Sequence, residues 1–250
     1  KKKFKLISLK TDKVNYDNLS VALITDYQLG NQLITFGIEY EKQNMFNMFV
    51  QHSLGGEWDF NSIDDFVNGT ARVYYGNAPS LDPVDAGADW SYDVTTLFAQ
   101  SEYQFSDMLE ITYGVRYEKY GVSGQPALNQ NFVDAYGYAN TTTYDGADVF
   151  MPRLSFNLNL NESTEIYGGY GVFSGGNPNV WYSNMWSNDG VTAIQLNERG
   201  VDVFKTPMCG GRTGQRSSEG PGYAVPGNWV DQVHTGSSSG DRNKIARDLD

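Results

Sequence analysis

The sequence predicts an all-β chain built from long antiparallel strands. Aromatic residues are abundant, with 17 Tyr, 13 Phe and 5 Trp among 250 residues, and strands favour aromatic side chains. The 27 glycines suit a chain with many turns and close backbone approaches. Three segments also alternate apolar and polar residues, with the period of two that indicates strands with two unlike faces.

The first of these segments is a hairpin over residues 18–41. Gly30-Asn31 forms its two-residue turn, with Gly in the first position as a type II′ turn prefers. Folding about this turn gives one apolar face and one mixed, charged face. The apolar face contains the pairs Tyr27–Ile34, Thr25–Phe36, Leu23–Ile38 and Val21–Tyr40, and the mixed face contains Gln28–Leu33, Asp26–Thr35, Ile24–Gly37 and Ala22–Glu39.

The second hairpin covers residues 95–120 and turns near 106–108. Its alternation separates an apolar face from a polar one. The apolar face holds Leu97, Ala99, Tyr103, Leu109, Ile111, Tyr113, Val115 and Tyr117, and the polar face holds Gln100, Glu102, Gln104, Glu110, Thr112, Gly114, Arg116 and Glu118.

The third hairpin covers residues 151–173 and turns around 161–163. One face again collects apolar side chains, namely Leu154, Phe156, Leu158, Ile166, Tyr170 and Val172. The other face carries Arg153, Ser155, Asn157, Tyr167, Gly169 and Gly171.

Strand and turn lengths favour part of an antiparallel up-and-down transmembrane β-barrel. The predicted strands cover 14–28, 32–46, 92–105, 109–121, 151–160 and 164–174. Most reach the roughly 9–11 residues that a tilted strand needs to cross a membrane. Short turns alternate with long loops at 47–91, 122–150 and 175–250, and this asymmetry is typical of outer-membrane barrels, with the long loops outside the cell.

A barrel assigns each face its own surroundings. We expect the apolar face to meet lipid, through Ile34, Phe36, Ile38, Ile111, Tyr113 and Val115. We expect the other face to line a lumen or contact a plug, through Glu102, Arg116, Glu118, Arg153, Gly169 and Gly171. Six strands cannot close a membrane barrel, because such barrels start at about eight strands. We therefore expect the chain to be a piece of a longer protein.

Composition argues against several other classes of function. A net charge of −12 disfavours a nucleic-acid partner, because phosphate binding needs clustered Lys and Arg. Cys209 is the single cysteine, and His52 and His234 lie far apart, so we expect no disulfide, no metal site and no cofactor. No segment has the roughly 20 apolar residues of a membrane helix. The basic start KKKFK is not followed by the apolar region of a signal peptide.

Several stretches resemble TonB-dependent outer-membrane receptors, in particular the Oar-like group. They are QLITFGIEYEKQNMFNMFVQ at 32–51, FNSIDDFVNG at 60–69, YDVTTLFAQSEYQFSDMLEITYGVRYEKY at 92–120, VFMPRLSFNLNL at 149–160 and FSGGNPNVWYSNMWSNDG at 173–190. The resemblance is weakest at 201–244. It implies a partial receptor barrel over 1–250, located in the outer membrane of a Gram-negative bacterium.

The resemblance also implies partners and a mode of action. The family has a barrel of about 22 strands filled by a plug domain. An energised inner-membrane TonB complex pulls on the plug through a short TonB box, and substrates enter from the extracellular loops. Neither a plug nor a TonB box occurs in this sequence. Small molecules, glycans and peptides are the implied substrate classes, and Oar-like members are also tied to protein export.

The loop at 173–190 is rich in aromatic residues and has no catalytic group. Trp181, Tyr182 and Trp186 are therefore the candidate ligand-contacting residues. Two interpretations remain open for them: they pack the loop onto the barrel rim or plug, or they stack on cargo with their large rigid rings.

Enzyme activity is not expected. The loop carboxylates have no fixed partners and read as solvated acids, although calcium binding stays an alternative; they are Asp64, Asp65, Asp82, Asp85, Asp89, Asp145 and Asp148. No GxSxG elbow or GK[ST] phosphate loop is present. A passive porin and a soluble β-rich carbohydrate-binding module remain as rival functions. Short helices are expected at 228–234 and 241–250, within the long final loop.

Overall fold

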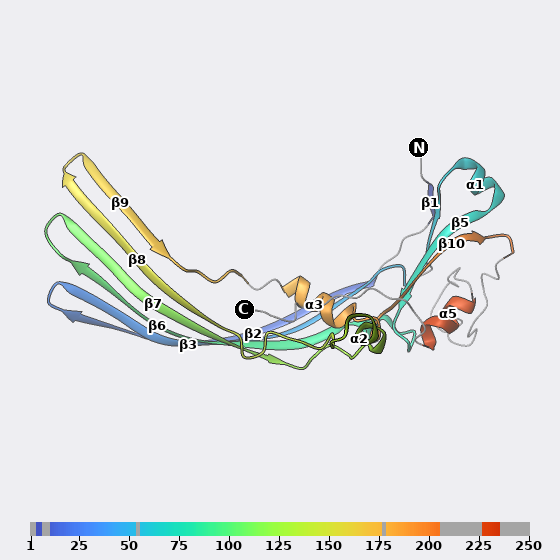
Figure 1. Cartoon of the computed structure of the whole chain (residues 1–250), viewed down its shortest axis with the longest axis horizontal. Helices are drawn as coiled ribbons and strands as arrows, with labels where there is room; N and C mark the ends of the chain where they lie inside the picture. Colours follow the sequence, from blue (N-terminus) through green and yellow to red (C-terminus); the bar gives the residue numbers. More distant parts are fainter. Residues whose placement is uncertain (1–3, 7–10, 54–55, 177–178, 206–226, 236–250) are drawn as a thin grey trace.

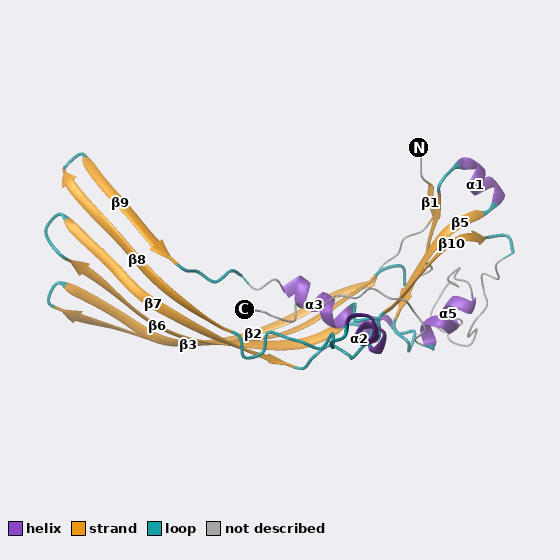
Figure 2. Ribbon diagram, in the orientation of Figure 1, coloured by secondary structure: helices purple, strands orange, loops and turns teal. Residues whose placement is uncertain are grey.

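The computed structural model describes residues 4–6, 11–53, 56–176, 179–205 and 227–235, which fold mainly into two antiparallel sheets (Figure 2). The larger sheet contains β2 (Thr11–Leu29), β3 (Gln32–Val50), β6 (Ala88–Gln104), β7 (Leu109–Ser123), β8 (Asp148–Asn161) and β9 (Thr164–Gly171). They lie side by side in that order, so each of the six strands pairs with the sheet strand that precedes it and the one that follows it along the chain. This arrangement confirms the antiparallel, up-and-down, all-β fold, as an open sheet.

The register follows from the alternation of side chains. In the first hairpin Tyr27 pairs with Ile34 and Leu23 with Ile38, as predicted, and Gly30 supplies the positive φ of 55° that its turn requires. Since paired residues share a face, the apolar positions Tyr27 and Leu23 meet apolar positions of the next strand. The second and third hairpins also keep the predicted faces.

The three tight turns lie together at one end of the sheet, and the long connections lie at the other (Figure 1). β2 and β3 each have 19 residues and extend beyond the predicted 14–28 and 32–46. At about 3.3 Å per residue they are roughly 60 Å long, well beyond the length needed to cross a membrane. We call the end with the long connections the loop end.

The smaller sheet was not predicted from the sequence. It contains β1 (Phe4–Leu6), β4 (Glu57–Phe60), β5 (Thr70–Asn77) and β10 (Ile194–Asp202), in the order β1-β4-β5-β10. The loops expected at 47–91 and 175–250 therefore contain strands that pair with one another. Helix α5 (Gly227–His234), close to the predicted 228–234, packs its Trp229 and Val233 into the core of this sheet. The helix expected at 241–250 lies outside the described residues.

Short helices occupy the connections at the loop end. They are α1 (Ile63–Asn68), the 3-10 helix η1 (Pro83–Ala86), α2 (Gln130–Tyr136) and α3 (Asn179–Ser187). Ser62, Asp82 and Asn129 cap the first three with side-chain oxygens that accept from backbone N–H groups.

None of the helices among the described residues is both long enough and apolar enough to span a membrane.

Candidate functional site

The six-stranded sheet has an outer face without acidic or basic side chains over its central rows. One row joins Tyr27, Ile34, Ser101, Tyr113 and Leu154 across five strands. The register places all six residues predicted to face lipid on this face: Ile34, Phe36, Ile38, Ile111, Tyr113 and Val115. Phe36, Ile38, Tyr113 and Val115 are among its exposed side chains.

The opposite, inner face is polar and collects all six residues predicted to face a lumen or plug. One row runs from Glu102 through Thr112 and Ser155 to Gly169. The next row contains Gly114, Arg153 and Gly171, and Arg116 and Glu118 follow along β7. At Gly169 an added Cβ would lie only 2.9 Å from the carbonyl oxygen of Leu154, so the backbone itself forms the surface there.

Arg116 is the centre of the charged network on the inner face. Its Nη1 donates to Glu39 Oε2 over 2.8 Å, and its Nε donates to Glu118 Oε1 over 2.7 Å. Its Nη2 donates to Thr96 Oγ1 over 3.2 Å. Three neighbouring strands, β3, β6 and β7, thus hold one guanidinium through charge-assisted bonds, which are stronger than neutral ones.

Glu118 links this network to the loop end. It is buried, and its Oε2 accepts from Tyr120 Oη over 2.9 Å and from Ser174 Oγ over 3.0 Å. Ser174 follows the end of β9, so its contact ties the chain leaving β9 to the inner face of β7. The backbone N–H of Ser174 also points to Met151 Sδ at 3.0 Å.

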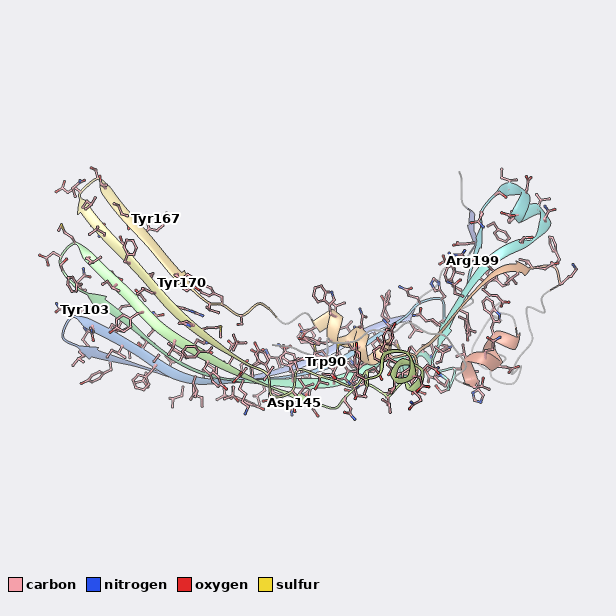
Figure 3. The ribbon with its side chains drawn as sticks, viewed as in Figure 1. Trp90, Tyr103, Asp145, Tyr167, Tyr170 and Arg199 are labelled. Atoms are coloured by element: carbon pink, nitrogen blue, oxygen red, sulfur yellow. The ribbon has the colours of Figure 1, made fainter. Side chains whose placement is uncertain are left out.

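An aromatic cluster covers the inner face next to this network. We call it the mouth cluster, and its members are Trp90, Tyr92, Tyr144, Tyr182 and Trp186. Trp90 stacks on Trp186 at 5.5 Å between ring centroids, and Tyr182 lies 4.3 Å from Tyr144. Trp90 Nε1 donates to Ser183 Oγ over 3.3 Å. These contacts hold α3 against β6, where Figure 3 shows Trp90 beside that helix.

Burial changes the acidity of the cluster's phenols. It raises the pKa of Tyr144 far above its usual value, with Tyr182, Tyr92 and Tyr120 as further causes. Burial also raises the pKa of Tyr182. Both phenols therefore stay neutral at any physiological pH, and the cluster packs as an uncharged aromatic layer between α3 and β6.

Comparison with known proteins supplies the family. A family model described as TonB dependent receptor-like, beta-barrel matches residues 5–224. The chain belongs to this family. No curated protein and no solved structure matches the chain. Members of the TonB-dependent receptor family act in transport across the outer membrane of Gram-negative bacteria, which agrees with the polar inner face and apolar outer face of this sheet.

In this receptor chain the three candidate ligand-contacting aromatics have different surroundings. Trp186 is only 7% exposed and Tyr182 belongs to the same cluster, so both pack α3 onto β6. Trp181, on the same helix, is 73% exposed. Of the three, Trp181 presents a ring that a ligand can reach.

Three of the acids expected in loops accept hydrogen bonds from the chain itself, two from backbone N–H groups and one from a phenol. Asp82 Oδ1 accepts from Val84 N, Asp145 Oδ1 from Val122 N, and Asp148 Oδ2 from Tyr117 Oη. No group of three or more His, Cys, Asp or Glu residues in the described part of the chain could hold a metal ion. Cys209 lies outside the described residues.

The two histidines also have structural neighbours. His52 Nδ1 lies 3.2 Å from Glu57 Oε2, and His234 Nδ1 lies 2.8 Å from the carbonyl oxygen of Pro79. The two residues sit in separate contacts and share no ligand geometry.

Sequence reasoning missed two partners that complete the site. Glu39 had been placed on the mixed face of the first hairpin, and only the sheet order brings it to Arg116. Trp90 lies two residues before the predicted start of its strand, although it continues the alternation of Tyr92 and Val94. Extending that alternation upstream would have identified Trp90 as an inner-face residue.

Proposed function

We propose that this chain forms part of the wall of an outer-membrane receptor that binds a substrate at its extracellular loops. The receptor would pass that substrate inward with energy delivered by the TonB complex. One observation carries the proposal: the same six strands present an outer face that is uncharged over its central rows and an inner face organised around Arg116. The wall of a membrane barrel needs an apolar outer face toward lipid and a polar inner face toward an aqueous or plug-filled lumen.

The direction of the strands follows from the lengths of the connections. The three tight turns would face the periplasm, and the loop end, with α3 and the smaller sheet, would face the outside. The plug domain of the full-length receptor would contact the inner face, where Gly169 adds no side chain and where Glu102 and Arg153 offer charge. The stretch at 173–190 supports an Oar-like receptor as the subgroup.

Trp181 is the residue that we propose for substrate contact. Its neighbour Val180 is also exposed, and the pair lies on the helix that the mouth cluster fixes to the inner face. An exposed, firmly mounted indole suits stacking on a flat face of a small molecule, glycan or peptide. Trp186 and Tyr182 would support the helix beneath it.

Uptake by cells that carry the full-length receptor tests this function. Labelled ferric siderophore, cobalamin and oligosaccharide serve as probes, with and without a protonophore. We expect one probe to enter, and the protonophore to stop its entry. Entry that persists with the protonophore would indicate a passive porin. Recovery of the receptor in the soluble fraction would indicate the soluble binding module and contradict the membrane location.

Trp181→Ala sharpens the same assay. Loss of one stacking contact, about 0.5–1.5 kcal/mol, should raise the KM for uptake roughly twofold to tenfold while the amount of folded receptor stays unchanged. Val180→Ala on the same exposed surface is the matched control and should leave the KM within about twofold. An unchanged KM in Trp181→Ala would remove this residue from the binding site.

A further inference from the structure

A groove of about 370 Å³ opens on the outer face of the six-stranded sheet. Its walls include Ile34 on β3 and Tyr113 and Val115 on β7, and its floor is Ala99 and Ser101 on β6. The other lining residues are Gln100, Gly114 and Arg153, which occupy one inner-face row by register, so Gly114 contributes only backbone. The volume falls in the range of small-molecule sites.

The groove exists because β6 places two small side chains in consecutive outer positions. Ser101 pairs with Ile34 on one side and with Tyr113 on the other. Ala99 likewise pairs with Phe36 and Val115. Larger side chains at Leu97 and Tyr103 continue β6 beyond the two small ones, at either end. The result is a channel along one strand, about two strand spacings or roughly 10 Å from backbone to backbone of its walls.

A polar atom lies at the floor of this otherwise apolar channel. Ser101 is only 6% exposed, and its Oγ is buried without a hydrogen-bond partner. A buried hydroxyl without a partner is unfavourable, and more so in surroundings that contain no water. The three rows around Ser101 hold no acidic or basic side chain, so an occupant of the groove must itself be uncharged at this depth.

Position then decides the chemistry of the occupant. Ser101 lies four residues from Leu97 and six from Thr95, whose row contains the charged Lys119 and Asp148, so it sits roughly 14 Å from that edge of the apolar face for a strand tilted by about 45°. Acyl chains fill that depth in the membrane, whereas headgroups and free aqueous ligands do not reach it. A channel roughly 10 Å between backbones, narrowed by its side chains, suits an extended chain rather than a helix, whose diameter is about 10–12 Å.

We propose that the groove is a lipid site that holds one acyl chain, and that the Ser101 side chain turns to present its buried Oγ to an oxygen on that chain as a hydrogen-bond partner. The occupant class is a membrane lipid whose chain carries a hydroxyl near its middle. The inference rests on the proposed membrane location of the outer face. It goes beyond that location, because it distinguishes one position on the face from the rest.

Lipid retention by the purified full-length receptor tests the proposal. Two probes are compared by native mass spectrometry: phosphatidylethanolamine with plain octadecanoyl chains, and the same lipid with a hydroxyl at the tenth carbon of one chain. We expect the wild-type receptor to retain the hydroxylated lipid about fivefold more tightly, the size of effect expected for one net hydrogen bond. Ser101→Ala should abolish this preference and keep binding of the plain lipid.

A second set of variants in the same lipid-retention experiment fills the groove with a larger side chain. Ser101→Leu should lose retention of both lipids, whereas Thr25→Leu, on the outer face of β2 and outside the groove, should behave as wild type. Equal retention of the two lipids by the wild type, or unchanged retention in Ser101→Leu, would overturn the groove assignment. A receptor absent from the membrane fraction would instead contradict the proposed function, so the two failures are distinguishable.

Discussion

The outer and inner faces of the six-stranded sheet share one ladder of backbone hydrogen bonds but carry different kinds of side chain. On the outer face, Ile111, Tyr113 and Val115 follow one another along β7 with no charged neighbour in their rows. On the inner face of the same strand, Arg116 and Glu118 are bonded to each other, Arg116 also to Glu39 on β3, and Glu118 also to Ser174 beyond the end of β9. The difference shows that adjacent residues of one strand can belong to separate environments, and it predicts opposite responses to the same substitution.

Ile111→Arg should produce the largest effect. If the outer face meets lipid, an arginine costs roughly 2–4 kcal/mol at mid-membrane and less toward the turn from which β7 starts, and the amount of folded receptor in the outer membrane should fall. Thr112→Arg is the matched control, because Thr112 lines an inner hollow of about 510 Å³ together with Glu110 and Ser155. In Thr112→Arg, the new guanidinium can occupy that hollow and lie near the carboxylate of Glu110.

Resistance of the folded barrel to heat and detergent on a gel measures both variants. Equal yields for Ile111→Arg and Thr112→Arg would show that the two faces do not differ in the way proposed. A poor yield for Thr112→Arg alone would place the plug domain directly over the inner hollow.

Arg116→Ala tests the inner face with a smaller effect. Removing the guanidinium leaves Glu39 and the buried Glu118 without their shared cation, which should lower the free energy of unfolding by about 1–3 kcal/mol. Arg153→Ala is the control, because Arg153 lies 4.9 Å over the ring of Phe173 and is itself exposed. That contact is worth roughly 0.5–1 kcal/mol.

Denaturant unfolding of the full-length receptor gives both values. The double variant Arg116→Ala/Glu118→Gln should recover part of the lost free energy of unfolding, because it removes the charge of one of the two carboxylates that no longer have a cation. Equal costs for Arg116→Ala and Arg153→Ala would mean that the network adds nothing specific to the inner face.

The sequence predicted the large sheet well because its information is local. Period-two alternation within each strand and a short turn between strands fix the register, so the pair Leu23–Ile38 could be written down in advance. The family assignment also followed from stretches within these hairpins. Face membership of Arg116 and Glu118 came with the register, but their hydrogen bonds to Glu39 and Ser174 depend on chain segments far away.

The smaller sheet and the mouth cluster could not be predicted because their partners are distant in sequence. Arg72 on β5 bonds Asn197 on β10, 125 positions away, and Trp90 bonds Ser183, 93 positions away. β4 has only four residues, too few to show a period. The residues of a polar loop do not indicate which distant loop it will contact. Trp181 and Trp186 could therefore not be distinguished from the sequence, although in the structure Trp186 packs in the mouth cluster and Trp181 is exposed to solvent.

Tyr144→Phe should have the smallest effect at neutral pH and a visible one in alkali. The phenol of Tyr144 is buried without a hydrogen-bond partner, so its removal should change the free energy of unfolding by less than about 0.5 kcal/mol near pH 8. Burial raises the pKa of Tyr144 above its ordinary value near 10, so the folded cluster keeps the proton that an unfolded chain gives up. Stability is therefore complete below about pH 10 and falls as the pH rises above it.

The comparison of melting curves at pH 8 and pH 11 isolates this contribution. Wild-type receptor should lose more stability between the two pH values than Tyr144→Phe, while Tyr167→Phe, an exposed tyrosine on the inner face of β9, should match the wild type at both. Tyr182 retains its own raised pKa, so the Phe variant should keep a smaller alkaline loss. Identical losses in wild type and Tyr144→Phe would mean that the cluster opens before the phenol ionises. In that case α3 is held to β6 by Trp90 and Trp186 more weakly than their burial indicates.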